Sequence, residues 1–316
     1  MRIHTTAEEL KDLEIKRPVV SVGTFDGLHR GHQKIVEHVK QKAMETGGES
    51  VIVTFQPHPR AVLKPDDKSF KILSTHLDKL SLFYKHRIDH LIVLKFNSEL
   101  ASKTAEEFIK AYLVESLAMQ HLVLGYDNKL GSDQLKRDED FETIARKMNV
   151  TFERLEPLKT NGKIISSSLI RDRLATGNVS EANELLGYEY FVFGRVSFGN
   201  QIGKNIGFPT ANIDVKDEHK MLPCNGVYVV KVNWNSYDYF GMCNIGIRPT
   251  INRSHFTFEV HLFDFYHDIY NDYLTVSFLD RIRDEKKFNS LQELESQLMR
   301  DKQTALSYIE KNGLQT

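Results

Sequence analysis

The chain has 316 residues and a formal net charge of −1, with 41% hydrophobic and 27% charged residues. This length predicts two domains, each with its own hydrophobic core. The balance of 42 basic and 43 acidic residues leaves no electrostatic footprint for nucleic acid or for an anionic membrane surface. The two cysteines, Cys224 and Cys243, exclude a disulfide scaffold and a four-cysteine zinc site. No segment has the apolar run of a signal peptide or a membrane span, so we expect a reduced, cytoplasmic protein whose oligomeric state stays open between a monomer and an oligomer.

The first half of the chain alternates between strand-like and helix-like segments. The strand-like runs are Val19–Val22, Val51–Phe55, Leu91–Phe96 and Leu122–Leu124. A helix is expected over Thr104–Leu117, because Thr104 and Glu107 have the spacing of a capping box. This alternation predicts an α/β domain with a mostly parallel sheet, whose ligands bind at the carboxyl ends of the strands.

The second half changes character after Gly187. Short strand-like runs continue to about residue 282, and Asn235–Ser236 has the position of a hairpin turn. This pattern predicts a closed barrel or a sandwich. A helical stripe in Asn289–Lys311 is expected to pack onto it; its apolar residues are Leu291, Leu294, Leu298, Ala305 and Ile309. We therefore expect two domains, residues 1–187 and 188–316.

The segment Gly23–His32, GTFDGLHRGH, follows a predicted strand and precedes a helix expected to begin near Gln33. Glycines allow tight turns and close backbone approach, and a helix N-terminus attracts anions, so the segment predicts a phosphate site. It is neither a P-loop nor a dinucleotide fingerprint. His29 and His32 offer hydrogen-bond donors to phosphates; alone, they would be two exposed histidines after a turn. A zinc site is disfavoured, because no cysteine or HExxH motif lies nearby.

Two further segments are suited to phosphate. In Ile165–Arg171, a serine cluster is expected to cap a helix, with Arg171 one turn later to bind a triphosphate; taken alone, the segment is better explained as an ordinary capped helix start. In Gly194–Asn212, spaced glycines and Lys204 suit a loop around phosphates, or simply β-turns. Thr210 and Asn212 supply neutral oxygens that join phosphate oxygens around Mg²⁺.

A strand over Phe256–Phe263 is expected to have two different faces. Alternation places Phe256, Phe258, Val260 and Leu262 on one face, and Thr257, Glu259 and His261 on the other. A carboxylate on the second face can accept the proton of a substrate hydroxyl that attacks ATP. On the residues alone, an exposed strand glutamate is the better interpretation of Glu259.

GTFDGLHRGH resembles the HxGH signature of the nucleotidyltransferase superfamily. With Thr54–Pro59 (TFQPHP), ISSSLIR and the GFPTAN that ends at Asn212, the whole chain resembles the prokaryotic bifunctional riboflavin kinase/FAD synthetase family. The resemblance implies an α/β Rossmann-like nucleotidyltransferase domain followed by a riboflavin-kinase β-barrel with a terminal helix. It also implies two reactions, phosphorylation of riboflavin to FMN and adenylylation of FMN to FAD with release of pyrophosphate. Their participants are ATP, riboflavin, FMN, FAD and Mg²⁺, without nucleic acid or membrane.

The resemblance also implies roles for particular residues. The catalytic residues are Glu259, His29, His32 and Arg171. The ATP- and phosphate-binding residues are Gly23, Phe25, Asp26, Gly27, Gly31, Ser167, Ser168, Gly199, Gly203, Lys204 and Gly207. The flavin-binding residues are Pro57, Pro59, Asp127 and Arg248, and the Mg²⁺ ligands are Thr210 and Asn212. His261 and Arg283 are secondary candidates, because a solvated strand face and a salt bridge explain them as well.

The chain departs from the family pattern in the segment after the strand ending at Leu124. The family's GxDFxFG reads GYDNKLG here, so Asn128 and Leu130 replace two aromatic residues that could cover a flavin ring. A variable surface loop is the alternative. Three other functions stay open: a monofunctional enzyme with one vestigial domain, a flavin-binding regulatory protein, and an HxGH nucleotidyltransferase for another phosphate ester.

Overall fold

The computed structural model describes the chain except residues 6–8, 10–12, 68, 199–202, 204–205, 250–253 and 315–316, and except the side chains of 247–249 and 254–256. Gly199 and Lys204, predicted to bind phosphate, therefore lie outside the described residues. The backbone contacts divide the chain into two compact units, Met1–Ser167 and Ser168–Thr316.

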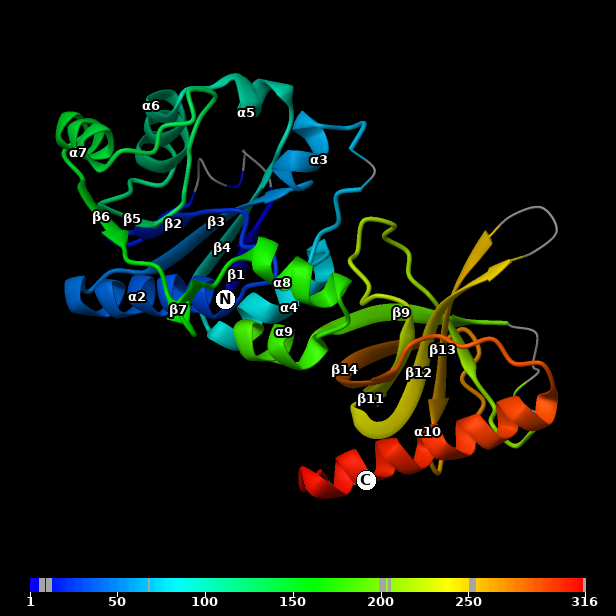
Figure 1. Ribbon diagram of the computed structural model, residues 1–316. Helices are drawn as coiled ribbons and strands as arrows, with labels where there is room; N and C mark the ends of the chain where they lie inside the picture. The colour runs from blue at the N-terminus through cyan, green and yellow to red at the C-terminus, as the bar shows by residue number, and fades with distance from the viewer. Residues whose placement is uncertain are drawn as a thin grey trace. The chain divides into compact units, whose positions relative to one another are not determined.

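The first unit is built on a six-stranded parallel sheet, in the order β1-β4-β3-β2-β5-β6 (Figure 1). The strands are β1 (Arg2–His4), β2 (Val19–Val22), β3 (Ser50–Gln56), β4 (His90–Lys95), β5 (His121–Gly125) and β6 (Thr151–Leu155). The predicted parallel α/β architecture is confirmed. The near-continuous apolar runs of the central strands are explained by helices that cover both faces of the sheet.

Helices on the two faces of the sheet close its core (Figure 1). On one face lie α2 (Arg30–Thr46) and α4 (His76–His86); on the other lie α5 (Ser98–Ser102), α6 (Ala105–Phe108), the π-helix η1 (Ile109–Glu115) and α7 (Asp138–Lys147). The capping box predicted at Thr104 and Glu107 is present and starts α6. After β3 comes the short α3 (Pro59–Leu63), and the hairpin β7 (Lys159–Thr160) and β8 (Lys163–Ile164) precedes α8 (Ser167–Ala175).

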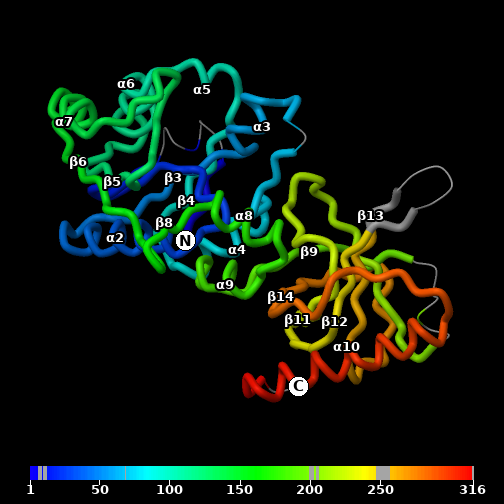
Figure 2. The backbone as a smooth tube through the Cα atoms, viewed as in Figure 1, coloured from blue at the N-terminus to red at the C-terminus, as the bar shows by residue number. Residues whose placement is uncertain are grey.

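The second unit is a closed six-stranded antiparallel barrel, in the order β10-β13-β12-β11-β14-β9 (Figure 2). Its strands are β9 (Phe191–Ser197), β10 (Ala211–Asp214), β11 (Gly226–Trp234), β12 (Tyr237–Pro249), β13 (Ser254–Leu262) and β14 (Tyr273–Arg283). The predicted hairpin is present: Asn235 and Ser236, with φ of 50° and 70°, join β11 to β12. Of the two architectures that the sequence left open, the structure has the barrel.

Two helices before the barrel are fastened to it. The side chain of Asn183, on α9 (Val179–Leu186), donates to the Phe278 carbonyl at 2.8 Å and accepts the Tyr190 N–H at 2.7 Å. The Cys224 N–H donates to the carbonyl of Leu174 on α8 at 3.0 Å. By contact, residues 168–187 therefore belong to the barrel unit; the functional boundary after Gly187 stays a prediction.

The last helix, α10 (Leu291–Lys311), lies along the outside of the barrel (Figure 1). Ala305 and Ile309 are buried against the barrel strands, with Leu298 partly buried beside them. Leu291, expected in the packed stripe, is instead 60% exposed, so the stripe prediction is wrong at the first residue of the helix. Within the described parts of the chain, no helix has the length and hydropathy needed to cross a membrane.

Candidate active sites

The strand order of the first sheet places the carboxyl end of β2 at a position where parallel α/β sheets commonly bind ligands. β2 lies between β3 and β5: the chain runs from β2 through β3 to β4 on one side and then crosses over to β5 on the other side. The carboxyl ends of these three parallel strands therefore meet where the strand order reverses, which is where open α/β sheets bind ligands. The segments that follow these three ends include the histidine loop, the TFQPHP segment and the loop that begins at Gly125.

The two histidines of the loop belong to the start of α2. The helix begins at Arg30, three residues before the predicted start near Gln33, because His29 itself is the N-cap. The His32 N–H donates to Nδ1 of His29 at 3.3 Å. Since Nδ1 of His29 acts as an acceptor, neutral His29 carries its proton on Nε2.

The imidazoles of His29 and His32 stack with their centroids 3.7 Å apart and their planes inclined by 15°. Burial, followed by the charges of His29 and Lys79, lowers the pKa of His32 well below its ordinary value. His32 is therefore neutral at pH 7 and acts as a hydrogen-bonding group rather than as a cation. Its Nδ1 is buried and has no hydrogen-bond partner among the described residues, which is the condition of a group that awaits a ligand.

Gly31 makes room for this arrangement. A Cβ on Gly31 would lie 3.1 Å from both Cε1 and Nδ1 of the His29 ring, so a larger residue would displace the imidazole. A larger residue at position 31 would therefore crowd the His29 ring in its present position.

Contacts within the first unit fix the rest of the loop. The carboxylate of Asp26 accepts the N–H groups of Leu73 and Ser74, each at 2.9 Å, and the Gly27 N–H donates to the Ser74 hydroxyl at 2.9 Å. The Ser167 hydroxyl donates to the Asp26 carbonyl at 2.8 Å. Asp26, Gly27 and Ser167 thus hold the loop in place; their contact with phosphate stays a prediction.

The other predicted residues beside this loop have separate environments. Gly23 donates its N–H to the Val53 carbonyl at 3.0 Å, and Phe25 is 2% exposed, with its ring 5.2 Å from that of His32. Ser168 is exposed and Arg171 half-buried, both on α8. Since the division between the units falls before Ser168, their roles at the histidine loop remain predictions.

The flavin side of the predicted site follows β3 and β5. Pro57 and Pro59 flank His58, whose Nδ1 accepts the Arg60 N–H at 3.1 Å as the N-cap of α3. Asp127 is exposed in the turn after β5. Their positions are compatible with a ligand at the carboxyl edge, and their contact with flavin stays a prediction.

The loop that departs from the family pattern is fixed in the domain. Asn128 donates to the Val22 carbonyl at the end of β2, and Leu130 is 6% exposed within the hydrophobic core. Gly131, with φ of 74°, lies against the backbone of α6: a Cβ there would be 2.1 Å from the Ala105 nitrogen. The segment lies at the surface, with Tyr126, Asp127, Lys129 and residues 132–134 exposed, while Leu130 fills the core.

In the barrel, the strand register brings the kinase candidates together. Asn212 on β10 lies directly opposite Glu259 on β13, and Asn244 on β12 lies opposite Glu259 on its other side. Directly opposed residues of antiparallel strands share one face of the sheet. A half-buried carboxylate therefore lies in a row between two amides, with Thr210 two residues before Asn212.

The face pattern of β13 is confirmed for the apolar residues and wrong for one polar residue. Phe258, Val260 and Leu262 are buried, and the side chain of Phe256 lies outside the described residues. His261 is 7% exposed rather than solvated, because the rings of Phe208 and Phe263 pack beside it.

His261 holds the segment before β10 through a hydrogen bond. Its Nδ1–H donates to the Pro209 carbonyl at 2.8 Å, and burial lowers its pKa, so the ring is neutral. In the same segment, the Phe208 N–H donates to the Gly203 carbonyl at 2.8 Å, and Gly207 has φ of 77°. These contacts hold residues 206–210, which lead directly into β10.

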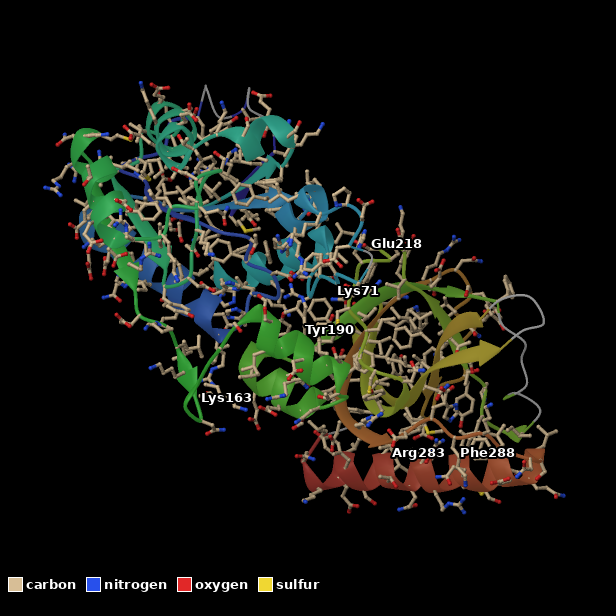
Figure 3. The ribbon with its side chains drawn as sticks, turned by 45° about the horizontal axis from the view of Figure 1, so that its top comes forward. Lys71, Lys163, Tyr190, Glu218, Arg283 and Phe288 are labelled. Carbon is tan, nitrogen blue, oxygen red and sulfur yellow. The ribbon has the colours of Figure 1, made fainter. Side chains whose placement is uncertain are left out.

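Two other candidate residues of the barrel, Arg248 and Arg283, differ in what the structure shows of them. Arg248 lies on β12, and its side chain is outside the described residues. Arg283 forms a fork with Asp301 of α10, with Nε–O distances of 2.9 and 3.0 Å and an Nη2–O distance of 2.7 Å. The salt-bridge interpretation of Arg283 is confirmed, and Figure 3 shows the residue beside α10, close to Phe288.

Sequence reasoning missed Lys79 as a functional candidate. Lys79 is a buried polar residue, 4% exposed, on the inner side of α4. The sequence signal for Lys79 was its place on the apolar face of an amphipathic helix, next to Leu82 and Phe83. A charged residue on a buried face is an exception that calls for a function.

The first unit carries a histidine loop on a parallel α/β sheet, and the second is a closed barrel with a carboxylate between two amides. Together they define the class of an ATP-dependent transferase with two domains. Residues 12–169 match the family model described as FAD synthetase, and residues 186–309 match the one described as riboflavin kinase. The chain belongs to the bifunctional riboflavin kinase/FMN adenylyltransferase family.

Similar proteins extend over nearly the full length of the chain. The bifunctional riboflavin kinase/FMN adenylyltransferase of Bacillus subtilis is 38% identical over 94% of this chain and 94% of its own. That of Haemophilus influenzae is 36% identical over 92% and 94%. A crystal structure of a Streptococcus pneumoniae protein, described as a macrolide-efflux protein, is similar at a TM-score of 0.87, with 32% identity over 96% of this chain and 98% of its own.

Proposed function

We propose that the two reactions of this family take place at two separate sites of this chain, FMN adenylylation at the histidine loop of residues 1–187 and riboflavin phosphorylation on the barrel of residues 188–316. The observation that carries the proposal is the stacked pair of His29 and His32 at the start of α2, with Nδ1 of His32 buried and unpaired among the described residues. Because both reactions use ATP, the cytoplasm is the compartment that fits.

In the kinase reaction, the 5′-hydroxyl oxygen of riboflavin attacks the γ-phosphorus of ATP, and ADP leaves. Glu259 accepts the hydroxyl proton, as a general base must. Its place between Asn212 and Asn244 in the strand register supports this role, because the amides orient the carboxylate and the phosphates without adding charge. Arg248, Gly203 and Gly207, with Gly199 and Lys204, are proposed to bind the flavin and the phosphates.

Thr210 and Asn212 would hold Mg²⁺ through neutral oxygens. They lie two residues apart where the backbone enters β10, opposite Glu259, and such a donor set fits an ion whose remaining ligands are phosphates and water. When bound, the ion supplies charge neutralisation on the transferred phosphoryl group.

In the adenylylation reaction, a phosphate oxygen of FMN attacks the α-phosphorus of ATP, and pyrophosphate leaves. Nε2–H of His29 and the ring of His32 are proposed to donate hydrogen bonds to the leaving oxygens as negative charge develops on them. The proposal is supported by the acceptor role of His29 Nδ1, which leaves Nε2 to carry the proton. Arg171, Ser167, Ser168, Gly23, Phe25, Asp26, Gly27 and Gly31 are proposed to form the ATP side of this site, and Pro57, Pro59 and Asp127 the flavin side.

The test is to incubate the intact protein with riboflavin, ATP and Mg²⁺ and to separate riboflavin, FMN and FAD by chromatography. The wild-type protein should make FAD through FMN. Glu259→Gln should lower FMN formation by about 10²–10⁴-fold and leave FAD formation from added FMN unchanged. His29→Ala with His32→Ala should abolish FAD formation while FMN accumulates, since each donor of this kind contributes about 10²–10³-fold.

The same assay distinguishes the alternatives. A protein with one vestigial domain would stop at FMN or would need added FMN, and a regulatory flavin-binding protein would convert neither substrate. Substantial FAD synthesis by the histidine double variant would contradict the assignment of the adenylylation site.

A further inference from the structure

Lys79 is a buried cation that lies beneath the histidine loop. Its side chain comes from α4 and is 4% exposed. Its Nζ donates to the Thr24 carbonyl at 2.8 Å, to the Thr54 hydroxyl at 3.3 Å and, at 3.5 Å, to the Phe55 carbonyl. An ammonium group has three N–H donors, so these three oxygens use all of them.

The three oxygens belong to two different strand ends. Thr24 follows β2 in the histidine loop, whereas Thr54 and Phe55 end β3 directly before the TFQPHP prolines. The Thr54 hydroxyl also donates to the Thr24 carbonyl at 3.2 Å, so hydroxyl and ammonium converge on the same carbonyl. Lys79 thus ties the segment proposed to bind ATP to the segment proposed to bind flavin.

The charged and titratable groups around this ammonium come from three elements. Asp26, in the loop after β2, favours the ammonium form, and His32, on α2, is affected by its charge. His76, on α4 itself, is affected as well. The neighbouring Asp78 is engaged in the capping box of α4 with Thr75.

We infer that Lys79 is a positioning residue for adenylyl transfer: its ammonium group clamps the end of β2 to the end of β3 and so sets the distance between the histidine pair and the FMN phosphate. This inference rests on the proposed function of the histidine loop. Lys79 itself touches neither substrate, because its three donors are already used within the protein. A small change in the separation of two reactants has a large effect on a reaction that depends on orientation.

The first test is the pH profile of FAD formation from FMN by the wild-type protein. Burial lowers the pKa of Lys79 to about 8, with Asp26 opposing the shift. Above this pH the ammonium becomes an amine with two N–H groups, so one of the three oxygens loses its donor. The rate constant kcat should therefore decline above about pH 8, by at most about tenfold per pH unit, and level off at the rate of the amine form, with a smaller effect on KM for FMN.

Two variants separate positioning from simple structural support. Lys79→Met should lower kcat at pH 7.5 by about tenfold or more and should lack the alkaline decline, while riboflavin phosphorylation is retained. Thr54→Val removes one acceptor of the charged form, so the decline should move to lower pH. The matched control is Lys85→Met, an exposed lysine on the same helix, which should behave as the wild type.

NMR of histidine-labelled protein provides a readout other than activity. Removal of the Lys79 charge in Lys79→Met should raise the pKa of His32, because that charge lowers it in the wild type. A wild-type adenylylation rate that stays constant to pH 9.5, or an alkaline decline that is unchanged in Lys79→Met, would overturn the inference. If Lys79→Met does not fold, the Thr54→Val shift decides.

The two proposals fail in different ways. If the His29→Ala, His32→Ala protein still makes FAD, the site assignment itself is wrong. If that protein is inactive and the Lys79 and Thr54 variants keep the wild-type profile, only the role of Lys79 is wrong.

Discussion

At the scale of single residues, the barrel site depends on a histidine that is buried beneath it. His261 accounts for the position of the Pro209 carbonyl, directly before Thr210, and so for the presentation of the proposed Mg²⁺ ligands. A buried carbonyl that loses its hydrogen-bond donor is left unpaired, which costs about 1–3 kcal/mol of stability. The backbone is expected to shift so that the carbonyl finds another partner.

His261→Leu should therefore lower the kcat of riboflavin phosphorylation by about tenfold. His261→Asn should retain most of the rate, because its side-chain amide nitrogen occupies a position close to Nδ1 and can donate to Pro209. Chromatographic measurement of FMN formation tests both, with the exposed His267→Leu as the control in the same unit. Equal rates in the Leu and Asn variants would show that the hydrogen bond has no part in positioning.

At the scale of elements, α10 is held to the barrel by a buried ion pair as well as by apolar contacts. Asp301 is 1% exposed, accepts both sides of the Arg283 fork and also accepts the Gln297 amide at 2.8 Å. Removal of one partner from such a pair leaves the other charge without compensation, which costs more than the pair itself contributes.

Asp301→Asn should lower the free energy of unfolding of the barrel unit by about 3–5 kcal/mol. Trp234 is the only tryptophan of the chain and lies on β11, so its fluorescence during urea titration reports this unit. Glu310→Gln, an exposed change on the same helix, should leave the midpoint where it is. A loss below about 1 kcal/mol for Asp301→Asn would mean that apolar contacts alone hold α10.

At the scale of the whole molecule, histidine burial is distributed unevenly between the two units. Among the histidines whose side chains the structure describes, burial is the largest cause that lowers the pKa of six: His4, His32, His76, His86, His121 and His261. Five belong to Met1–Ser167 and one to the barrel unit. Each binds a proton less readily when folded than when unfolded, where its pKa is about 6.5.

The first unit should therefore be the more sensitive to acid. The stability from these histidines is complete above about pH 6.5 and is lost as pH falls through their lowered folded values, because the unfolded chain then binds more protons. Urea titrations at pH 7.5 and pH 5.5 should show a larger decrease for the transition seen by circular dichroism alone than for the one reported by Trp234. Equal decreases, or a gain at pH 5.5, would contradict this distribution.

The sequence by itself determined the features that depend on neighbours along the chain. The strand and helix alternation of the first half, the capping box at Thr104, and the hairpin at Asn235–Ser236 follow from local periodicity and turn chemistry. Motif resemblance extended the prediction to candidate residues of both proposed sites, including Glu259 and the histidine pair, because a motif is a short segment of neighbouring residues.

Only the tertiary structure decided what depends on residues far apart in the chain. Closure of the barrel, the register that places Asn212 and Asn244 on either side of Glu259, and the convergence of Thr24 and Thr54 on Lys79 all join segments separated by more than ten residues. The physical reason is that burial and strand pairing are properties of the assembled fold. From the sequence, a lysine or histidine is predicted to be a surface residue. When other elements of the fold cover it, its hydrogen bonds must be satisfied within the protein.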